Sequence, residues 1–112
     1  VEFCREGRLV FRGTTWVGFV GLQTGMRMGA WSVSLNYRKV QRPVAVVKNV
    51  LGSFAGTWPI SFLIRRSLQD LADFRAVLEC MQSASLMAPC YFTLAGSEPG
   101  QGVVLERMRW GV

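Results

Sequence analysis

The chain has 112 residues, 50% of them hydrophobic and 18% charged, which is enough for one domain with a core but not for two. Thirteen basic residues against seven acidic ones give a net charge of +6. The basic residues are scattered without a run of five like charges, which excludes a basic tail of the kind that binds nucleic acid. Such scattered charge is typical of a solubilising surface, and it also favours contact with an anionic surface such as phospholipid head groups.

The nucleophiles and metal ligands of the chain are few. Histidine is absent, and Cys4, Cys80 and Cys90 form no C-x-x-C pair, so we expect no zinc site and no Cys-His or Ser-His-Asp machinery within the chain. Arginines near Cys4 make it a candidate nucleophile, but no base accompanies it, and a cysteine that fills a strand is the favoured interpretation. The glycines of "GFVGLQTG" lack the pattern of a nucleotide-binding loop.

The N-terminal part of the chain predicts strands and turns. Two short strands, residues 1–6 and 8–12, flank a turn at Glu6-Gly7. Residues 13–21, "GTTWVGFVG", have the composition of a strand interrupted by glycines, whereas residues 22–29 are predicted to be a turn.

Residues 30–37, "AWSVSLNY", predict the clearest strand, because apolar and small polar residues alternate along it. One face is suited to a core and carries Trp31, Val33, Leu35 and Tyr37. The opposite face is small enough for another layer or a ligand to approach.

The second half of the chain predicts helices and then strands. Helices are expected over residues 43–54 and 58–70, and a third begins at Asp70 or Asp73. Two strands follow, residues 90–96 and 102–109, joined by a hairpin. The order of strands, helices and strands indicates an α+β protein in which helices stack on a mainly antiparallel sheet.

Asn36 is the strongest candidate for a functional residue that the pattern itself offers. An asparagine at the end of a strand presents an NH2 donor pair, which suits a developing oxyanion, although polar residues end strands routinely. Aromatic residues such as Trp16, Trp31, Trp58 and Phe62 would line a lipid pocket or form plain core.

Two segments, "FRGTTWVGFVGLQTG" (11–25) and "SVSLNYR" (32–38), resemble a known family. It is the acid ceramidase and N-acylethanolamine-hydrolyzing acid amidase family, in the choloylglycine-hydrolase branch of the N-terminal nucleophile hydrolases. The similarity continues more thinly through "WPISFLIRRSLQDLADFRAVLECM" (58–81) and "LMAPCYFTLAGSEPGQGVVLERMR" (86–109).

The resemblance implies a four-layer αββα sandwich, with both sheets contributing strands and the helices of residues 58–82 covering one outer face. It implies cofactor-independent hydrolysis of linear amides by an N-terminal cysteine whose own α-amine is the base. In the family the nucleophile precedes the matching region, and further catalytic residues follow it. Residues 1–112 are therefore expected to be a partial catalytic domain of the β-subunit, partnered by the remaining segments or the α-subunit and inactive alone.

The resemblance also assigns site residues. Asn36 matches an asparagine that helps to form the oxyanion hole in bile-salt-hydrolysing relatives, and Arg38 matches the family's arginine, which contacts substrate or pairs with a carboxylate. Tyr37 departs from the family's glutamate, so substrate choice or pH optimum is expected to differ. The acyl chain of the substrate is expected to lie against Trp16, Phe19 or Trp31.

The expected function is hydrolysis of a lipid amide, of the ceramide or N-acylethanolamine type, to fatty acid and amine. The location that the resemblance implies is lysosomal or secreted. A non-catalytic relative that binds lipid or acyl chains after losing its nucleophile is the alternative, and a nucleic-acid-binding domain is a weaker third.

Overall fold

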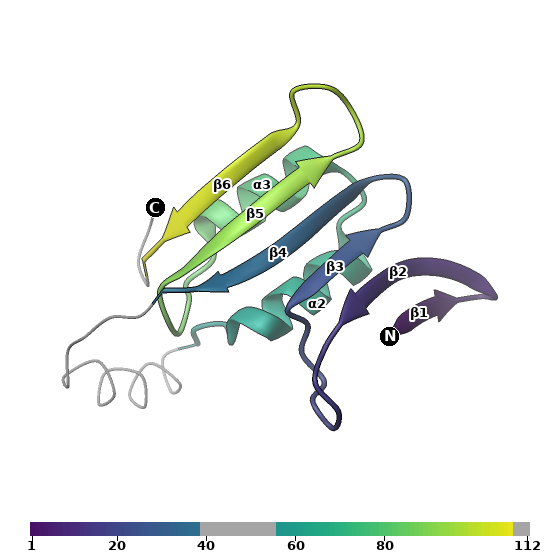
Figure 1. Cartoon of the computed structure of the whole chain (residues 1–112), viewed down its shortest axis with the longest axis horizontal. Coiled ribbons are helices and arrows are strands. Elements are labelled where there is room, and N and C mark those ends of the chain that lie inside the picture. Colours follow the sequence, from purple (N-terminus) through teal and green to yellow (C-terminus); the bar gives the residue numbers. More distant parts are fainter. Residues whose placement is uncertain (39–55, 109–112) are drawn as a thin grey trace.

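The computed structural model describes residues 1–38 and 56–108 (Figure 1). The helix predicted over residues 43–54 lies outside these ranges, as does the last residue of the strand predicted over 102–109. Two helices are described, α2 (Ile60–Asp70) and α3 (Phe74–Ser83). The strands are β1 (Glu2–Arg5), β2 (Arg8–Thr14), β3 (Thr24–Arg27), β4 (Trp31–Tyr37), β5 (Cys90–Gly96) and β6 (Gly102–Arg107).

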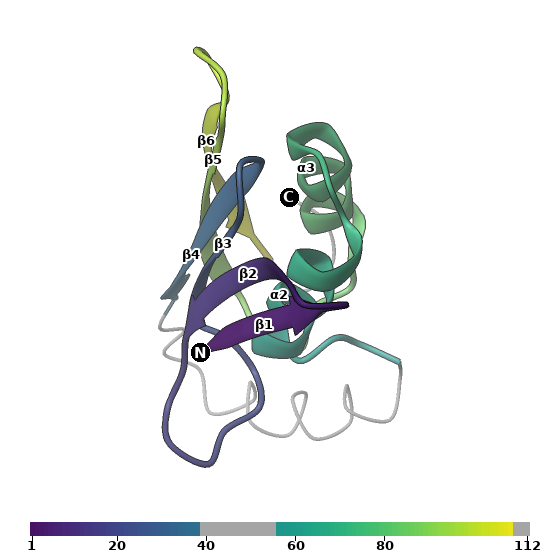
Figure 2. The same cartoon turned by 90° about the vertical axis from the view of Figure 1, so that its right-hand side faces the viewer.

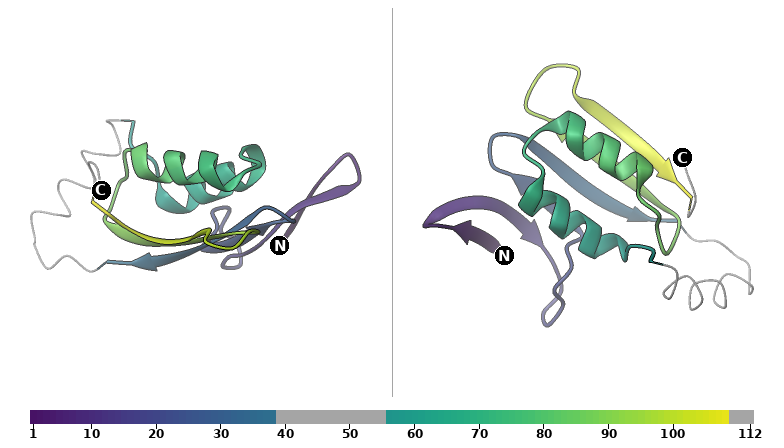
Figure 3. Two further views of the ribbon diagram at one scale, coloured as in Figure 1. Left: turned by 90° about the horizontal axis from the view of Figure 1, so that it is seen from above. Right: turned by 180° about the vertical axis from the view of Figure 1, so that it is seen from behind.

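The six described strands form one antiparallel sheet in the order β1-β2-β3-β4-β5-β6. Both helices pack on the same face of it, as the edge-on views show (Figures 2 and 3). The predicted α+β architecture, with helices on an antiparallel sheet, is confirmed. The expectation that these strands divide between two sheets is wrong for the described residues, because each strand pairs with the next one described along the chain.

Strand β3 corrects the turn predicted over residues 22–29. It pairs with both neighbours, and Gly25 lies opposite Gly13 on β2 and Val33 on β4. A Cβ atom on Gly25 would lie 2.3 Å from Cδ1 of the buried Leu68, so any larger residue would force the Leu68 side chain to move where α2 approaches the sheet. The glycine that predicted a turn is therefore a close-packing residue within a strand.

The turn predicted at Glu6-Gly7 is confirmed. Arg5 pairs with Arg8, and the two residues between them have positive φ angles of 52° and 74°, as in the two-residue turns that match the twist of hairpin strands. The strand character predicted for residues 13–21 ends at Thr14, and the chain continues as a loop to β3.

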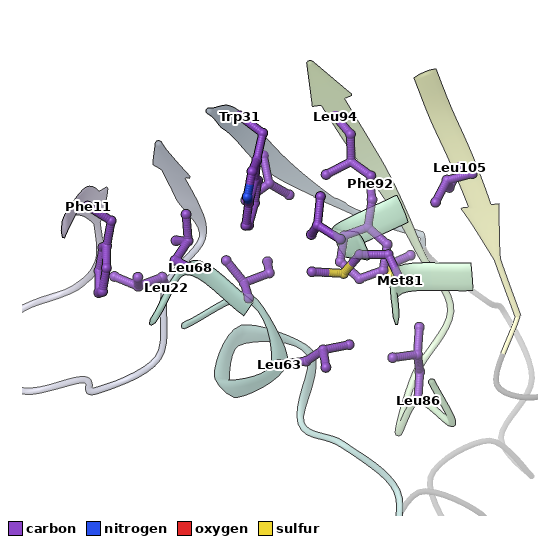
Figure 4. Close-up of a cluster of buried hydrophobic side chains, with 14 residues drawn as sticks. Phe11, Leu22, Trp31, Leu63, Leu68, Met81, Leu86, Phe92, Leu94 and Leu105 are labelled. Atoms are coloured by element: carbon purple, nitrogen blue, oxygen red, sulfur yellow. The ribbon is translucent and has the colours of Figure 1, made fainter. Parts of the chain in front are cut away.

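The core lies between the sheet and the helices, and its side chains come from every layer (Figure 4). Alternation along β4 and β5 directs every second residue into it, and the helices contribute residues three and four apart. Helix α3 begins where the Asp73 carboxylate accepts a hydrogen bond from the Ala76 N–H at 2.9 Å, which confirms one of the two predicted starts. The buried hydrophobic residues are Phe11, Leu22, Trp31, Val33, Leu63, Ile64, Leu68, Val77, Met81, Leu86, Cys90, Phe92, Leu94 and Leu105.

Two arginines from the sheet hold the C-terminal ends of the two helices. Nη1 of Arg27, on β3, donates to the Leu68 carbonyl of α2 at 2.5 Å. Arg107, on β6, is fully buried and donates to the carbonyl of Met81 in α3 and, at 2.7 Å, to that of Ala84 just beyond it. A cation is favourable at a helix C-terminus because the last carbonyls there lack partners within the helix.

Candidate functional site

The sheet has one face that the helices cover and one face that the described residues leave open. On β4 the buried side chains of Trp31 and Val33 face the helices, whereas Ser32, Ser34 and Asn36 point to the open face. A shallow hollow of about 570 Å³ lies on the open face over β2, β3 and the start of β4. The face predicted to admit a layer or a ligand is therefore the uncovered one.

Asn36 lies at the end of β4, exposed on this open face. It is paired with Tyr91 on β5, and Tyr91 is paired with Glu106 on β6, so the three form one row across the sheet. Within residues 1–38 and 56–108 the side-chain amide of Asn36 makes no hydrogen bond. Both of its N–H donors are thus unused by the described part of the chain.

Arg38 follows on the same face and contacts two neighbouring strands. Its guanidinium forms an ion pair with the Glu106 carboxylate, lies 3.2 Å from Sδ of Met108, and has Cζ at 5.9 Å from the centroid of the Tyr91 ring. Pairing with a carboxylate, one of the two roles predicted for this arginine, is thus observed.

Tyr37 is directed to the opposite face from Asn36 by the alternation of the strand. Its side chain is 75% exposed. The structure therefore places Tyr37 beside Asn36 in sequence and across the sheet from it in space.

The loop of residues 15–23 lies at the same end of the strands as Asn36. It joins the end of β2 to the start of β3, and the N–H of Leu35 donates to the Gln23 carbonyl at 2.9 Å. Trp16, near its tip, is 73% exposed, and the Phe19 ring contacts Phe62 edge-on with centroids 5.9 Å apart. Trp16 and Phe19, two of the three aromatic residues predicted to meet an acyl chain, thus belong to a loop at the end of the sheet where Asn36 lies.

The structure does not bring Trp31 to that end of the strands. Its ring is 2% exposed and packs in the core beneath the helices (Figure 4), and its Nε1–H donates to the Leu71 carbonyl at 2.9 Å. It also begins β4, whereas Asn36 lies near the end of the strand. The expectation that Trp31 lies against the acyl chain is corrected, because its indole is already enclosed by protein.

The three cysteines differ in their surroundings. Cys4 is exposed on β1, Cys80 is half-buried, and Cys90 is buried on β5. Burial raises the pKa of the Cys90 thiol from 9.0 to about 11, although the positive charge of Arg107 acts in the opposite direction. Cys90 is consequently an inert core thiol rather than a nucleophile.

Labelling with a thiol reagent should separate these cysteines. At pH 8 we expect Cys4 to react fastest, because it is exposed, and Cys90 to react only when the protein is unfolded. A raised folded-state pKa keeps the Cys90 thiol protonated until the pH approaches about 11. Mass spectrometry of time points, with Cys4→Ser as control, checks this; rapid labelling of Cys90 in folded protein at pH 8 would contradict its burial.

Tyr91 and Glu106 are the site neighbours that sequence reasoning missed. Each lies on a predicted strand, and each occupies an alternate position that points away from the core. Their proximity to Asn36 depends on the register of β4, β5 and β6, which local patterns do not reveal. Among the described residues, no group of three or more His, Cys, Asp and Glu is placed to hold a metal, and no helix is both long and apolar enough to cross a membrane.

Comparison with known proteins supports the motif resemblance along nearly the whole chain. No protein-family model matches the chain. It is 35% identical over 111 residues to the N-acylethanolamine-hydrolyzing acid amidase of Cavia porcellus, covering 99% of this chain and 31% of that protein. It is 32% identical over 111 residues to the acid ceramidase of Bos taurus, covering 97% of this chain and 28% of that protein.

The solved structure of a Caenorhabditis elegans N-acylethanolamine-hydrolyzing acid amidase orthologue decides the relationship. It superposes with a TM-score of 0.89 at 32% identity and covers 100% of this chain and 47% of that one. The chain is a homologue of the acid ceramidases and acid amidases. The chain spans less than a third of the length of the curated relatives above. The match confirms the α+β fold, in which the described residues form an antiparallel sheet and two helices.

Proposed function

We propose that the chain is part of a lipid-amide hydrolase, cleaving a C–N amide of the ceramide or N-acylethanolamine type to a fatty acid and an amine. The names of its relatives, an acid ceramidase and an acid amidase, support this class of substrate. The observation that carries the proposal is the exposed Asn36 amide, which ends a core strand on the open face with donors that the described residues do not use. A lysosomal or secreted location is proposed on the same kinship.

The parent architecture that we propose is a four-layer αββα sandwich in which residues 1–112 form a partial catalytic domain. The open face of the sheet favours the proposal that a second sheet packs on it, because it carries exposed apolar side chains among small polar ones. These apolar residues include Met26, Val104 and Met108. The nucleophile would come from a segment outside this chain. Cys4 lies on the edge strand β1, which β2 and β3 separate from β4 and Asn36.

Asn36 would act by stabilising charge in the transition state. When a nucleophile attacks the amide carbonyl, its oxygen becomes negative, and a side-chain N–H held at that position donates to it more strongly than to the ground-state oxygen. The acyl chain would lie along the exposed Trp16 and Phe19 of the loop. That apolar loop and the net positive charge also make an anionic membrane surface a proposed partner.

Replacement of Asn36 by alanine in the full-length gene product tests the proposal. Loss of an oxyanion donor costs on the order of 3 kcal/mol in the transition state, so kcat for release of fatty acid should fall roughly 100-fold while KM changes little. Substrates are ceramide and N-palmitoylethanolamine, and Ser34→Ala, two residues earlier on the same face, is the matched control.

Three results would count against this function. Unchanged kcat in Asn36→Ala removes the oxyanion role, and an equal loss in Ser34→Ala shows a general effect of the face. A wild-type protein that binds N-palmitoylethanolamine but releases no fatty acid overturns the hydrolase and favours the non-catalytic acyl-binding relative.

A further inference from the structure

An exposed asparagine at a strand end is poorly placed to stabilise a transition state unless something holds the strand end still. A donor contributes fully only when its position is set before the reaction, to within about 0.5 Å. The last residues of β4 are exposed, and the described residues offer the Asn36 side chain no hydrogen bond. Its position therefore depends on the backbone of β4 and on the neighbours of that backbone.

Arg38 supplies such a neighbour immediately after the strand. Its side chain lies on the same face as Asn36 and reaches across the end of β5 to β6. Three different groups surround the guanidinium: a carboxylate from Glu106, the ring of Tyr91 and the sulfur of Met108. Because these contacts come from two other strands, movement of the β4 end would have to break an ion pair and a cation–π contact together.

The contacts of Arg38 with Glu106 and Tyr91 form a clamp on the end of β4. The row of Asn36, Tyr91 and Glu106 links this clamp to the proposed site. Tyr91 lies between the other two in the sheet, and its ring is covered by the guanidinium of the residue two positions after Asn36. The contacts therefore bracket the asparagine, with Tyr91 beside it on β5 and Arg38 following it on the chain.

We propose that Arg38 and Glu106 are positioning residues that hold the end of β4 and thereby orient the Asn36 amide toward the carbonyl oxygen of the substrate. The inference rests on the proposed function for its catalytic consequence. Glu106 acts only through Arg38, and neither residue contacts the reacting atoms. Their contribution is to the geometry of the asparagine, so it is realised in kcat rather than in the affinity for substrate.

Kinetics of the full-length protein test the catalytic consequence. Arg38→Ala and Glu106→Gln should each lower kcat about tenfold while KM stays within about twofold. The reversed pair, Arg38→Glu with Glu106→Arg, should recover most of the loss, which a non-specific structural effect would not allow. Arg75→Ala, which breaks the exposed Arg75–Glu79 pair on α3, is the matched control and should leave kcat unchanged.

Hydrogen exchange of the same proteins tests the clamp without requiring activity. Backbone amides of residues 35–37 should exchange several-fold faster in Arg38→Ala than in wild type or Arg75→Ala, because the strand end opens more often. Unchanged exchange in Arg38→Ala, or unchanged kcat despite faster exchange, overturns the positioning role. A wild-type protein without hydrolase activity overturns the proposed function, and the exchange data then still decide whether the clamp exists.

Discussion

Replacing Trp31 with alanine should lower the free energy of unfolding by about 3–5 kcal/mol, the usual cost of removing a large aromatic side chain from a core. The indole is 2% exposed, and its Nε1–H satisfies the Leu71 carbonyl just after the end of α2. The substitution therefore leaves a cavity and an unpaired carbonyl at once. Urea unfolding followed by circular dichroism measures the change.

Trp16→Ala is the matched control for this prediction, because it removes the same side chain from an exposed position. A surface substitution of this kind should change the free energy of unfolding by no more than about 0.5 kcal/mol. If Trp31→Ala unfolded like wild type but lost affinity for an acyl chain, the core assignment would be wrong and the role predicted from the family resemblance would be restored.

Replacing Arg107 with methionine should destabilise the fold by about 3 kcal/mol, although methionine fills much of the same volume. The loss comes from the carbonyls of Met81 and Ala84, which would remain at the end of α3 without their charged donor. Burial lowers the pKa of Arg107, the nearby Cys90 acting in the opposite direction, but the guanidinium stays charged at any physiological pH.

Arg12→Met provides the comparison for this second substitution. Arg12 pairs with Glu2 through exposed side chains, Nε to Oε1 at 2.8 Å, and such surface pairs contribute about 0–1 kcal/mol. Thermal and urea unfolding of both variants should show a large loss for Arg107→Met alone. Equal, small losses would mean that the helix end is satisfied in another way.

The parts of the fold that could be predicted are those specified by local patterns. Alternation identified β4, the hairpin signal identified β5 and β6, and 3- and 4-residue spacing identified α3. Strand β3 could not be recognised, because the same glycines that permit a turn also permit the close approach of a helix to a strand. Division of the strands between two sheets was wrong for the described residues, since pairing is non-local and the expectation came from a whole-protein architecture.

In the candidate site, too, the residues marked by a local pattern could be predicted, and those brought close by strand pairing could not. Asn36 and Arg38 were identified from the sequence, but Glu106 and Tyr91 approach them only through the register of three strands. Trp31 illustrates a different error. Alternation had placed it on the core face, which the structure confirms, whereas its aromatic character had suggested an acyl pocket. The periodicity of the strand was the better guide, because it reports direction rather than residue type.

The arginines that hold the helix ends have a mechanical consequence. Arg27 links β3 to α2 and Arg107 links β6 to α3, so each helix is fastened to a different part of the sheet. Sliding of the helical layer across the sheet would strip charge-assisted hydrogen bonds from buried or half-buried carbonyls at both points. Shear between the helical layer and the sheet is therefore opposed.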